Sequence, residues 1–225
     1  MSSPNLVVED YTSSKDKIET FLDDTMKIIT STCSSAELEG NAFYYHLSAN
    51  RFFELFSKQV NLFWCGRQVT KRICEIGFNA GHSAFLFLLG MKSANVEFTV
   101  FDLGEHPYTR PCLGHLKTTF PETEFSYIEG DSTKTLPEWT ALHPEASETY
   151  DVVHVDGGHS FECAQSDIMY GANLVRPGGY LIVDDTNVPY ISSMVDALVR
   201  SEMFTEVEIL RTVGYEHRIV QRKAT

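Results

Sequence analysis

From residue 71 onward, short apolar segments alternate with segments of helical periodicity, and this alternation restricts the fold more than any other feature of the sequence. The predicted strands cover residues 72–76, 96–101, 124–128, 151–155, 180–183, 207–213 and 216–221. The predicted helices cover residues 81–89, 111–119, 132–142, 161–175 and 190–203. Strands that alternate with helices form right-handed βαβ units, so we expect an α/β fold with a doubly wound, mostly parallel, seven-stranded sheet. The last two strands read as a hairpin, which makes one strand antiparallel.

A segment of different character precedes this alternation. We treat residues 1–69 as an N-terminal helical extension and residues 70–225 as the core. Apolar residues at helical spacing predict helices over 14–31 and 42–60. A short connection that contains Phe63 should follow them.

Two segments outside the strand ends are candidates for contact with a substrate. Tyr44 and Tyr45 lie in an aromatic-rich part of the second predicted helix. Packing on the sheet edge, or between the copies of a homo-oligomer, accounts for most such aromatics without a substrate. The loop at 105–110 follows a strand, and long loops in that place commonly shape specificity.

Composition and charge exclude several classes of partner. Hydrophobic residues make up 43% and charged residues 22%, as in soluble proteins, and no apolar run reaches the roughly 18 residues that span a bilayer. The net charge is −13 without a cluster of Lys or Arg, so we expect neither nucleic acid nor membrane as a partner. The five cysteines form no C-x-x-C pair, and the N-terminus resembles no secretory signal. A cytoplasmic, reduced setting is the expectation.

The turn after the first core strand has the composition of a ligand-binding loop. Gly77 and Gly81 are spaced G-x-x-x-G, and glycine lets a ligand approach the backbone closely. The helix that follows offers free N–H groups at its first turn. Asp102 follows Gly81 by 21 residues at the end of the second strand. A carboxylate in that place can accept hydrogen bonds from the ribose hydroxyls of an adenosine.

The acid before the glycines distinguishes between two classes of adenosine ligand. A dinucleotide loop has the pattern G-x-G-x-x-G, and this loop lacks the middle glycine. Glu75 would repel a pyrophosphate but would attract the amino group of a methionine moiety. These residues therefore favour a cationic adenosyl ligand over a nicotinamide dinucleotide.

With these residues in place, the chain resembles the class I S-adenosylmethionine-dependent methyltransferases over roughly residues 70–222, which implies a Rossmann-like fold. The shared pattern is E-x-G-x-x-x-G, an acid ending strand two, G-D-[ST], and an acid ending strand four. The resemblance implies that cofactor binding involves Glu75, Gly77, Asn79, Gly81, Ser83, Asp102, Leu103, Gly130, Asp131, Ser132 and Asp156. In it, Gly77 and Gly81 line the methionine end, and Asp131 and Ser132 lie by the adenine. Asp131-Ser132 also suits a helix N-cap, and both roles are compatible.

A second group of acids follows strands four and five. The carboxyl ends of neighbouring parallel strands meet at one crevice, so Asp156, Asp184 and Asp185 should lie close together. Three carboxylates in a cleft repel one another unless protons or a cation compensate them. Oxygen ligands suit Mg²⁺ or Ca²⁺ better than zinc.

The pattern D-G-x-H followed by P-G-G and D-D is similar to the small-molecule O-methyltransferases of sugars, macrolides and catechols. That resemblance implies Mg²⁺ bound by Asp156, Asp184 and Asp185, and the Asp-Asp pair fits the sugar and macrolide type better than the catechol type. A hydroxyl on Mg²⁺ loses its proton more easily, and His159 is a candidate to accept that proton. Asp156 and His159 are therefore the predicted catalytic residues.

Several readings stay open at this level. The acceptor is expected to be a small molecule with a hydroxyl, and the alternatives are N-methylation of a small amine without metal or a non-catalytic adenosyl-binding protein. The acid pair could also be an exposed loop without metal, and His159 could simply bond to its own turn. His154 would face the crevice wall or the core, and His82 would cover the adenosine or stay exposed.

Overall fold

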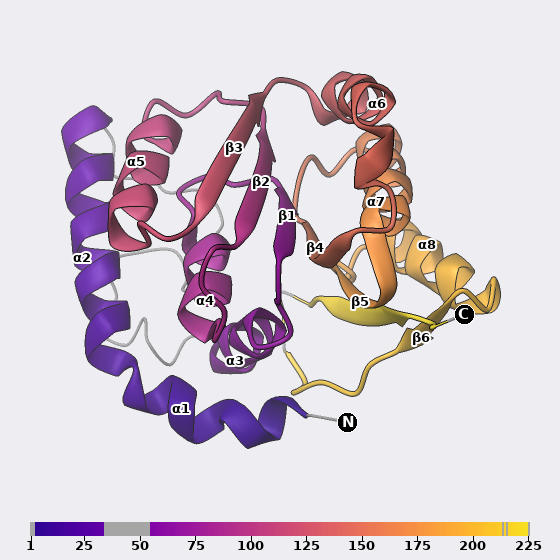
Figure 1. Ribbon diagram of the computed structural model, residues 1–225, viewed down its shortest axis with the longest axis horizontal. Coiled ribbons are helices and arrows are strands. Elements are labelled where there is room, and N and C mark those ends of the chain that lie inside the picture. The colour runs from indigo at the N-terminus through magenta and orange to yellow at the C-terminus, as the bar shows by residue number, and fades with distance from the viewer. Residues whose placement is uncertain (1–2, 34–54, 213, 215, 225) are drawn as a thin grey trace.

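The computed structural model describes residues 3–33, 55–212, 214 and 216–224, and its centre is a seven-stranded sheet (Figure 1). The strand order is β3-β2-β1-β4-β5-β7-β6. β7 runs antiparallel to both β5 and β6, and the other neighbouring strands pair in parallel. This confirms the predicted α/β fold with one antiparallel strand. The strands are β1 Arg72–Ile76, β2 Glu97–Asp102, β3 Glu124–Glu129, β4 Tyr150–Val155, β5 Val175–Val183, β6 Phe204–Glu206 and β7 Arg218–Arg222.

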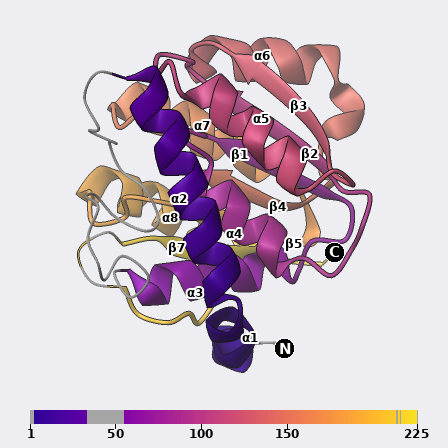
Figure 2. The same ribbon diagram turned by 90° about the vertical axis from the view of Figure 1, so that its left-hand side faces the viewer.

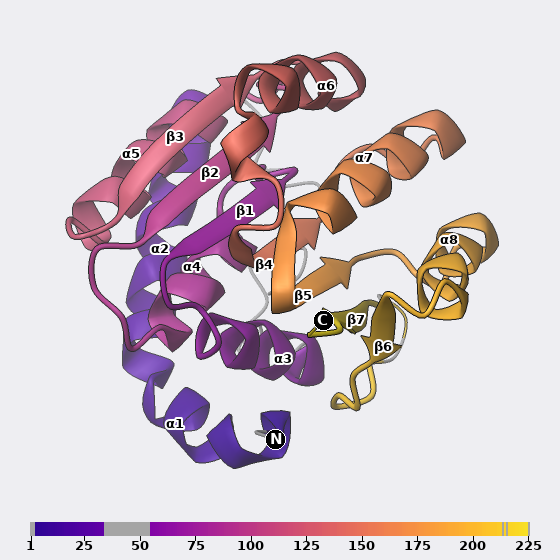
Figure 3. The ribbon, with the colours of Figure 1, turned by 45° about the vertical axis from the view of Figure 1, so that its right-hand side comes forward.

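Helices cover both faces of the sheet (Figure 3). One face carries α2 to α5 and the other carries α6 to α8, and neighbouring residues of one strand point to opposite faces, as Val152 and Val153 do. Figure 2 shows α2 lying across the layer that contains α4 and α5. Of the helices in the described ranges, none could cross a bilayer. They are α1 Val8–Ser13, α2 Lys15–Thr32, α3 Phe56–Gly66, α4 His82–Gly90, α5 Thr109–Thr119, α6 Ser132–Leu142, α7 Phe161–Leu174 and α8 Pro189–Arg200, with 3₁₀ turns η1 Pro4–Val7 and η2 Pro144–Ala146.

The helix α3 differs from its prediction. Residues 42–54 of the predicted helix, with Tyr44 and Tyr45, lie outside the described residues. The predicted connection at Phe63 was wrong, because α3 continues through it to Gly66. The last nine residues of α3 are all buried, and the polar side chains of Lys58, Gln59 and Asn61 are buried with the apolar ones. One hydrophobic core contains α2, α3 and strand residues alike, and it runs across the predicted boundary at residue 70.

The predicted strand at 207–213 was also wrong. β6 lies just upstream of it, and residues 207–212 form no strand. The reason is a side chain from α3: Asn61 Nδ2 donates to the Leu210 carbonyl at 2.8 Å, and Asn61 Oδ1 accepts from the Leu210 N–H at 3.0 Å. Because the Asn61 side chain satisfies the hydrogen bonds of the Leu210 N–H and carbonyl groups, Leu210 does not need a strand partner.

The helices α3 and α4 touch backbone to backbone. A Cβ built on Gly66 would lie 2.1 Å from the Phe87 carbonyl oxygen, and one built on Gly90 would lie 2.1 Å from the Phe63 carbonyl oxygen. No side chain larger than hydrogen fits at either position. These two glycines therefore fix how closely α3 approaches α4.

Gly66→Ala should destabilise the fold by roughly 2 kcal/mol or more, because the added methyl group must push two helix backbones apart. The matched control is Gly114→Ala in α5, where an added Cβ would meet nothing within 4 Å. That control should stabilise the fold by about 0.5–1 kcal/mol, as alanine does in an open helix interior. Urea denaturation of both variants measures the difference. Equal stabilities would show that the contact between α3 and α4 is not tight.

Candidate active site

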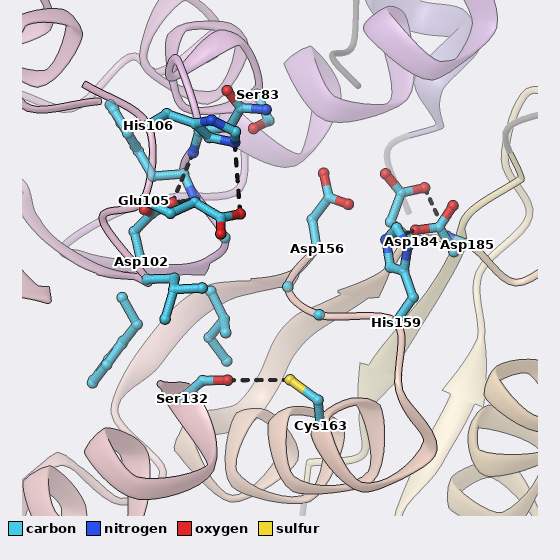
Figure 4. Close-up of a pocket in the computed structure, with 18 of the residues that line it drawn as sticks. Ser83, Asp102, Glu105, His106, Ser132, Asp156, His159, Cys163, Asp184 and Asp185 are labelled. Atoms are coloured by element: carbon cyan, nitrogen blue, oxygen red, sulfur yellow. Dashed lines mark hydrogen bonds and ion pairs between the residues drawn. The ribbon is translucent and has the colours of Figure 1, made fainter. Parts of the chain in front are cut away.

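A cavity of about 650 Å³ opens at the carboxyl ends of β1, β2, β4 and β5 (Figure 4). Most of the predicted site residues line it, although they come from five separate loops. They are Gly77, Asn79, Ser83, Asp102, Leu103, Gly130, Asp131, Ser132, Asp156, His159, Asp184 and Asp185. Glu75 and Gly81 are not among its lining residues.

The two loop glycines are required by the protein's own backbone. Gly77 has φ +90°, and a Cβ there would lie 2.0 Å from the Asp156 carbonyl oxygen. Gly81 has φ +77°, and a Cβ there would lie 2.5 Å from the Phe78 ring. Both positions favour glycine for this conformation alone. The expectation that Gly81 makes room for a ligand therefore has a simpler explanation in the turn itself.

Glu75 lies beneath the loop instead of facing the cavity. Its side chain is fully buried, and Oε1 accepts from Ser83 Oγ at 2.5 Å and from His154 Nδ1 at 2.9 Å. Glu75 Oε2 is buried and has no hydrogen-bond partner among the described residues. In this arrangement Glu75 orients Ser83 and His154. Contact between Glu75 and the amino group of a methionine moiety stays a prediction.

Asp102 connects two walls of the cavity. Its Oδ2 accepts from the N–H groups of Phe78 at 2.8 Å and Asn79 at 2.9 Å, and its Oδ1 accepts from the Gly104 N–H at 2.7 Å. A carboxylate offers about four acceptor directions, so one direction is left for a ribose hydroxyl. Asn79 is itself held by the Tyr108 hydroxyl, which donates to Asn79 Oδ1 at 2.8 Å.

Asp131 is the N-cap of α6, as the sequence suggested. Its Oδ1 accepts from the Thr133 N–H at 3.0 Å and from Thr133 Oγ1 at 2.6 Å, and these bonds hold the pKa of Asp131 below its ordinary value. Ser132 lies beside Cys163, with Oγ and Sγ 3.4 Å apart (Figure 4). Both Asp131 and Ser132 line the cavity, so capping leaves them available to a ligand.

The acids after β4 and β5 converge as predicted. A ring nitrogen of His154 and carboxylate oxygens of Asp156 and Asp184 lie within 4.8 Å of one another. Asp156, His159 and Asp185 form a second group with the same spacing. We call these five residues the acid cluster. Burial and the Asp184 carboxylate raise the pKa of Asp156 well above its ordinary value.

The cluster also contains a cation that was not predicted from the sequence. Lys58 reaches it from α3 and forms an ion pair with the Asp184 carboxylate. Lys58 is only 6% exposed and Asp184 only 4%. Burial opposes the charge of both groups, but their attraction prevails, so the pKa of Lys58 is raised and that of Asp184 is lowered. A lysine just before the apolar residues of this helix was the signal available in the sequence.

His217 is a second residue near the cluster that was not predicted from the sequence. Burial lowers the pKa of His217 to about 3, so the imidazole is neutral. Its Nε2 lies 3.1 Å from Asn61 Nδ2, which donates to it. Lys58 and Asn61 are one turn apart on α3, and together they tie this helix to Asp184 and to the end of the chain.

Three other histidines lie at the rim, in the wall and in the core of the site. His159 stands at the rim, where Nε2 donates to Asp185 Oδ2 at 2.8 Å, and this bond raises the pKa of His159. Tyr190 donates a hydrogen bond to the His159 carbonyl. His82 is 6% exposed and lines the cavity, so it belongs to the wall. His154 is fully buried behind Asp156.

Asp167 in α7 is a buried carboxyl beneath the loop at Gly157. It is fully buried, its Oδ2 accepts from Cys163 Sγ at 3.5 Å, and its Oδ1 has no partner among the described residues. A Cβ built on Gly157 would lie 2.6 Å from Asp167 Oδ2, so the loop packs directly on this carboxyl. Burial raises the pKa of Asp167 to about 6.

Asp167→Asn should stabilise the protein increasingly as pH rises. The folded state binds the Asp167 proton more tightly than the unfolded state, so ionisation costs stability as pH rises from the ordinary pKa of 3.8 to about 6 and stays constant above. The variant's advantage should grow by about 2 kcal/mol between pH 4.5 and 7. Denaturation at several pH values measures it, with exposed Glu122→Gln as the control. An advantage that does not change with pH would contradict this account.

Comparison with known proteins shows which family the chain belongs to. The sequence matches the methyltransferase-domain family over residues 74–186, about half of the chain. No curated protein matches the chain significantly.

Solved structures share the fold at low sequence identity. An O-methyltransferase from Bacillus cereus, in complex with S-adenosylhomocysteine, has a TM-score of 0.59 and 18% identity, over 96% of this chain and 99% of that chain. The TDP-rhamnose 3′-O-methyltransferase CalS11 of calicheamicin biosynthesis has a TM-score of 0.56 and 15% identity, over 78% and 81%. A precorrin-6y C5,15-methyltransferase from Geobacter metallireducens has a TM-score of 0.51 and 13% identity, over 76% and 88%.

The solved structures share only the fold with this chain. The family match includes the loop from Gly77 to Gly81, the strand that ends at Asp102 and the acids up to Thr186. The cavity lies where those segments meet. The chain belongs to the methyltransferase-domain family and is a class I S-adenosylmethionine-dependent methyltransferase.

Proposed function

We propose that this protein transfers the methyl group of S-adenosylmethionine to a hydroxyl of a small-molecule acceptor. The observation that carries the proposal is the acid cluster at the far end of the cofactor cavity, with Asp156 half-buried and His159 at the rim. An acceptor hydroxyl needs an oriented partner and a proton acceptor, and these two side chains supply both. The names of the B. cereus and calicheamicin enzymes, both O-methyltransferases, are consistent with it.

In this proposal the cofactor lies along the cavity from Asp131 to Asp156. The adenine lies by Asp131 and Ser132, and the ribose hydroxyls bond to the free acceptor direction of Asp102. The methionine end lies against the loop after Gly77. All of these residues line the one cavity, and its 650 Å³ is within the size range of small-ligand sites.

The chemistry is an in-line displacement at the sulfonium carbon. The acceptor oxygen forms a bond to the methyl carbon while the carbon–sulfur bond breaks, and S-adenosylhomocysteine leaves. His159 accepts the hydrogen bond of the acceptor hydroxyl and receives its proton, and the neighbouring Asp156 carboxylate stabilises the imidazolium that results. Asp185, bonded to His159 at 2.8 Å, fixes the direction of the imidazole.

The Mg²⁺ ion predicted from sequence has oxygen ligands available in Asp156, Asp184 and Asp185, but the arrangement of the described residues does not suit it. Asp184 is already paired with the Lys58 ammonium, and its Oδ1 accepts from the Asp185 N–H at 3.0 Å. Mg²⁺ demands near-octahedral oxygen coordination, and an ammonium group in the cluster repels a divalent ion. No step of the proposed reaction therefore involves a metal.

N-methylation of a small amine is the second candidate. The acid cluster favours it, because buried carboxylates attract an ammonium group on an acceptor. A neutral amine also attacks the methyl group without prior loss of a proton. Turnover of amines with no turnover of matched alcohols would select this alternative.

S-Adenosylhomocysteine should raise the melting temperature of the intact protein, because a ligand that binds only the folded state stabilises it. Asp102→Ala should abolish this shift, and Glu124→Ala, at the amino end of β3, should retain it. Differential scanning fluorimetry measures both. A shift with NAD(P) in place of S-adenosylhomocysteine would mean that the cavity serves an oxidoreductase.

Asp156→Asn and His159→Gln should each lower kcat for methyl transfer by about 100-fold or more, in the range typical of lost acid–base groups. The matched control is His143→Gln, because His143 is an exposed histidine at the end of α6. Transfer of the labelled methyl group from S-adenosylmethionine to a panel of small alcohols, phenols, sugars and amines measures the effect. If His159→Gln is as active as His143→Gln, His159 is not the proton acceptor. Cofactor binding with no acceptor methylated at all would favour the non-catalytic alternative.

A further inference from the structure

We propose that the Lys58 ammonium is the resident cation of the acid cluster and holds the place that a divalent metal would otherwise take. The metal-excluding part of the proposal depends on the geometry alone. Its bearing on methyl transfer rests on the function proposed above. Lys58 is a positioning residue in this account, because it acts by fixing Asp184 and compensating its charge.

The first step is that Lys58 is built into the cluster. It is 6% exposed, it lines the cavity, and its ammonium is paired with a carboxylate that is 4% exposed. The helix that carries it cannot shift easily, because Gly66 and Gly90 hold α3 and α4 in backbone contact. Asn61, one turn further along α3, fixes the same helix to Leu210.

The second step is that the cluster without Lys58 would be a metal site. His154, Asp156 and Asp184 present one imidazole and two carboxylate ligands within 4.8 Å of one another. His154 Nδ1 bonds to Glu75, which fixes the ring, and His154 Nε2 is buried without a partner among the described residues. A histidine oriented by a carboxylate behind it is the usual arrangement of a metal ligand. One histidine with two carboxylates suits a transition metal such as Mn²⁺.

The third step is that Lys58 and a metal exclude each other. Asp156 and Asp184 stand next to each other at the edge of the cavity (Figure 4), and a cation between them must share their charge. A divalent ion beside a buried ammonium would be strongly repelled at these distances. Removing the ammonium would leave Asp184 without its partner and restore its affinity for a metal.

The test is Mn²⁺ binding by the wild-type protein and by Lys58→Met, which keeps an unbranched apolar side chain and loses the charge. Electron paramagnetic resonance of free Mn²⁺ measures binding, and the melting temperature with and without Mn²⁺ is the second readout. The wild type should bind Mn²⁺ at this site too weakly to change its melting temperature, and it should be insensitive to EDTA. Lys58→Met should bind Mn²⁺ at least 100-fold more tightly than the wild type and gain melting temperature from it. Lys58→Arg, which keeps the charge, should behave as the wild type.

Two results would overturn the proposal. One is Mn²⁺ binding by the wild type that Asp184→Asn abolishes, and the other is a folded Lys58→Met that binds no Mn²⁺. If Lys58→Met fails to fold without metal, Lys58→Met/Asp184→Asn removes both charges together and should restore folding but bind no metal. Failure of that double variant to fold would show that Lys58 is needed for packing and not for charge.

The same samples are tested with S-adenosylhomocysteine, which separates the two proposals. A normal thermal shift and the expected Mn²⁺ results, without methylation of any acceptor, would leave the role of Lys58 intact and contradict the proposed function. Methyl transfer by a wild-type protein that requires Mn²⁺ would contradict the role of Lys58 and leave the proposed function intact.

Discussion

The carboxylates that gather at the ends of β4 and β5 impose the constraint on which the rest of the site depends. The buried Asp184 and the half-buried Asp156 lie side by side, and like charges in such a place repel unless a cation or a proton compensates them. The ammonium of Lys58 provides that cation from a helix outside the alternating strands and helices. Lys58 can reach the cluster because α3 packs tightly against α4. This tight packing requires glycine at positions 66 and 90.

This dependence makes the N-terminal part of the chain a component of the site. α3 contributes Lys58 to the cluster and Asn61 to the segment before β7, and the core that buries α3 also contains strand residues. The segment at 207–212 is therefore held by α3 instead of pairing as a strand. A change in how α3 packs against α4 should therefore alter the environment of Asp184 and the position of the C-terminal strands.

The sequence predicted those features that depend on local patterns. Short apolar segments between helical ones identified every strand except β6. The acids that end β2, β4 and β5 were expected at one edge because parallel strands end together. Lys58, Asn61 and the burial of Glu75 could not be predicted in this way, because each depends on a contact between distant segments. Glu75 followed the family pattern in sequence, yet its partners are Ser83 and His154, and only the packing of α4 against β4 brings those together.

The central claim is that a lysine from α3, and not a metal, neutralises the acids that face the methyl group. A crystal structure of the protein with S-adenosylhomocysteine, grown with excess Mn²⁺ and measured at the manganese absorption edge, tests it most directly. The account predicts ribose hydroxyls on Asp102, the cofactor sulfur turned toward Asp156, the Lys58 ammonium on Asp184, and no anomalous peak in the cluster. An anomalous peak between Asp156 and Asp184, with the Lys58 side chain displaced from them, would contradict it.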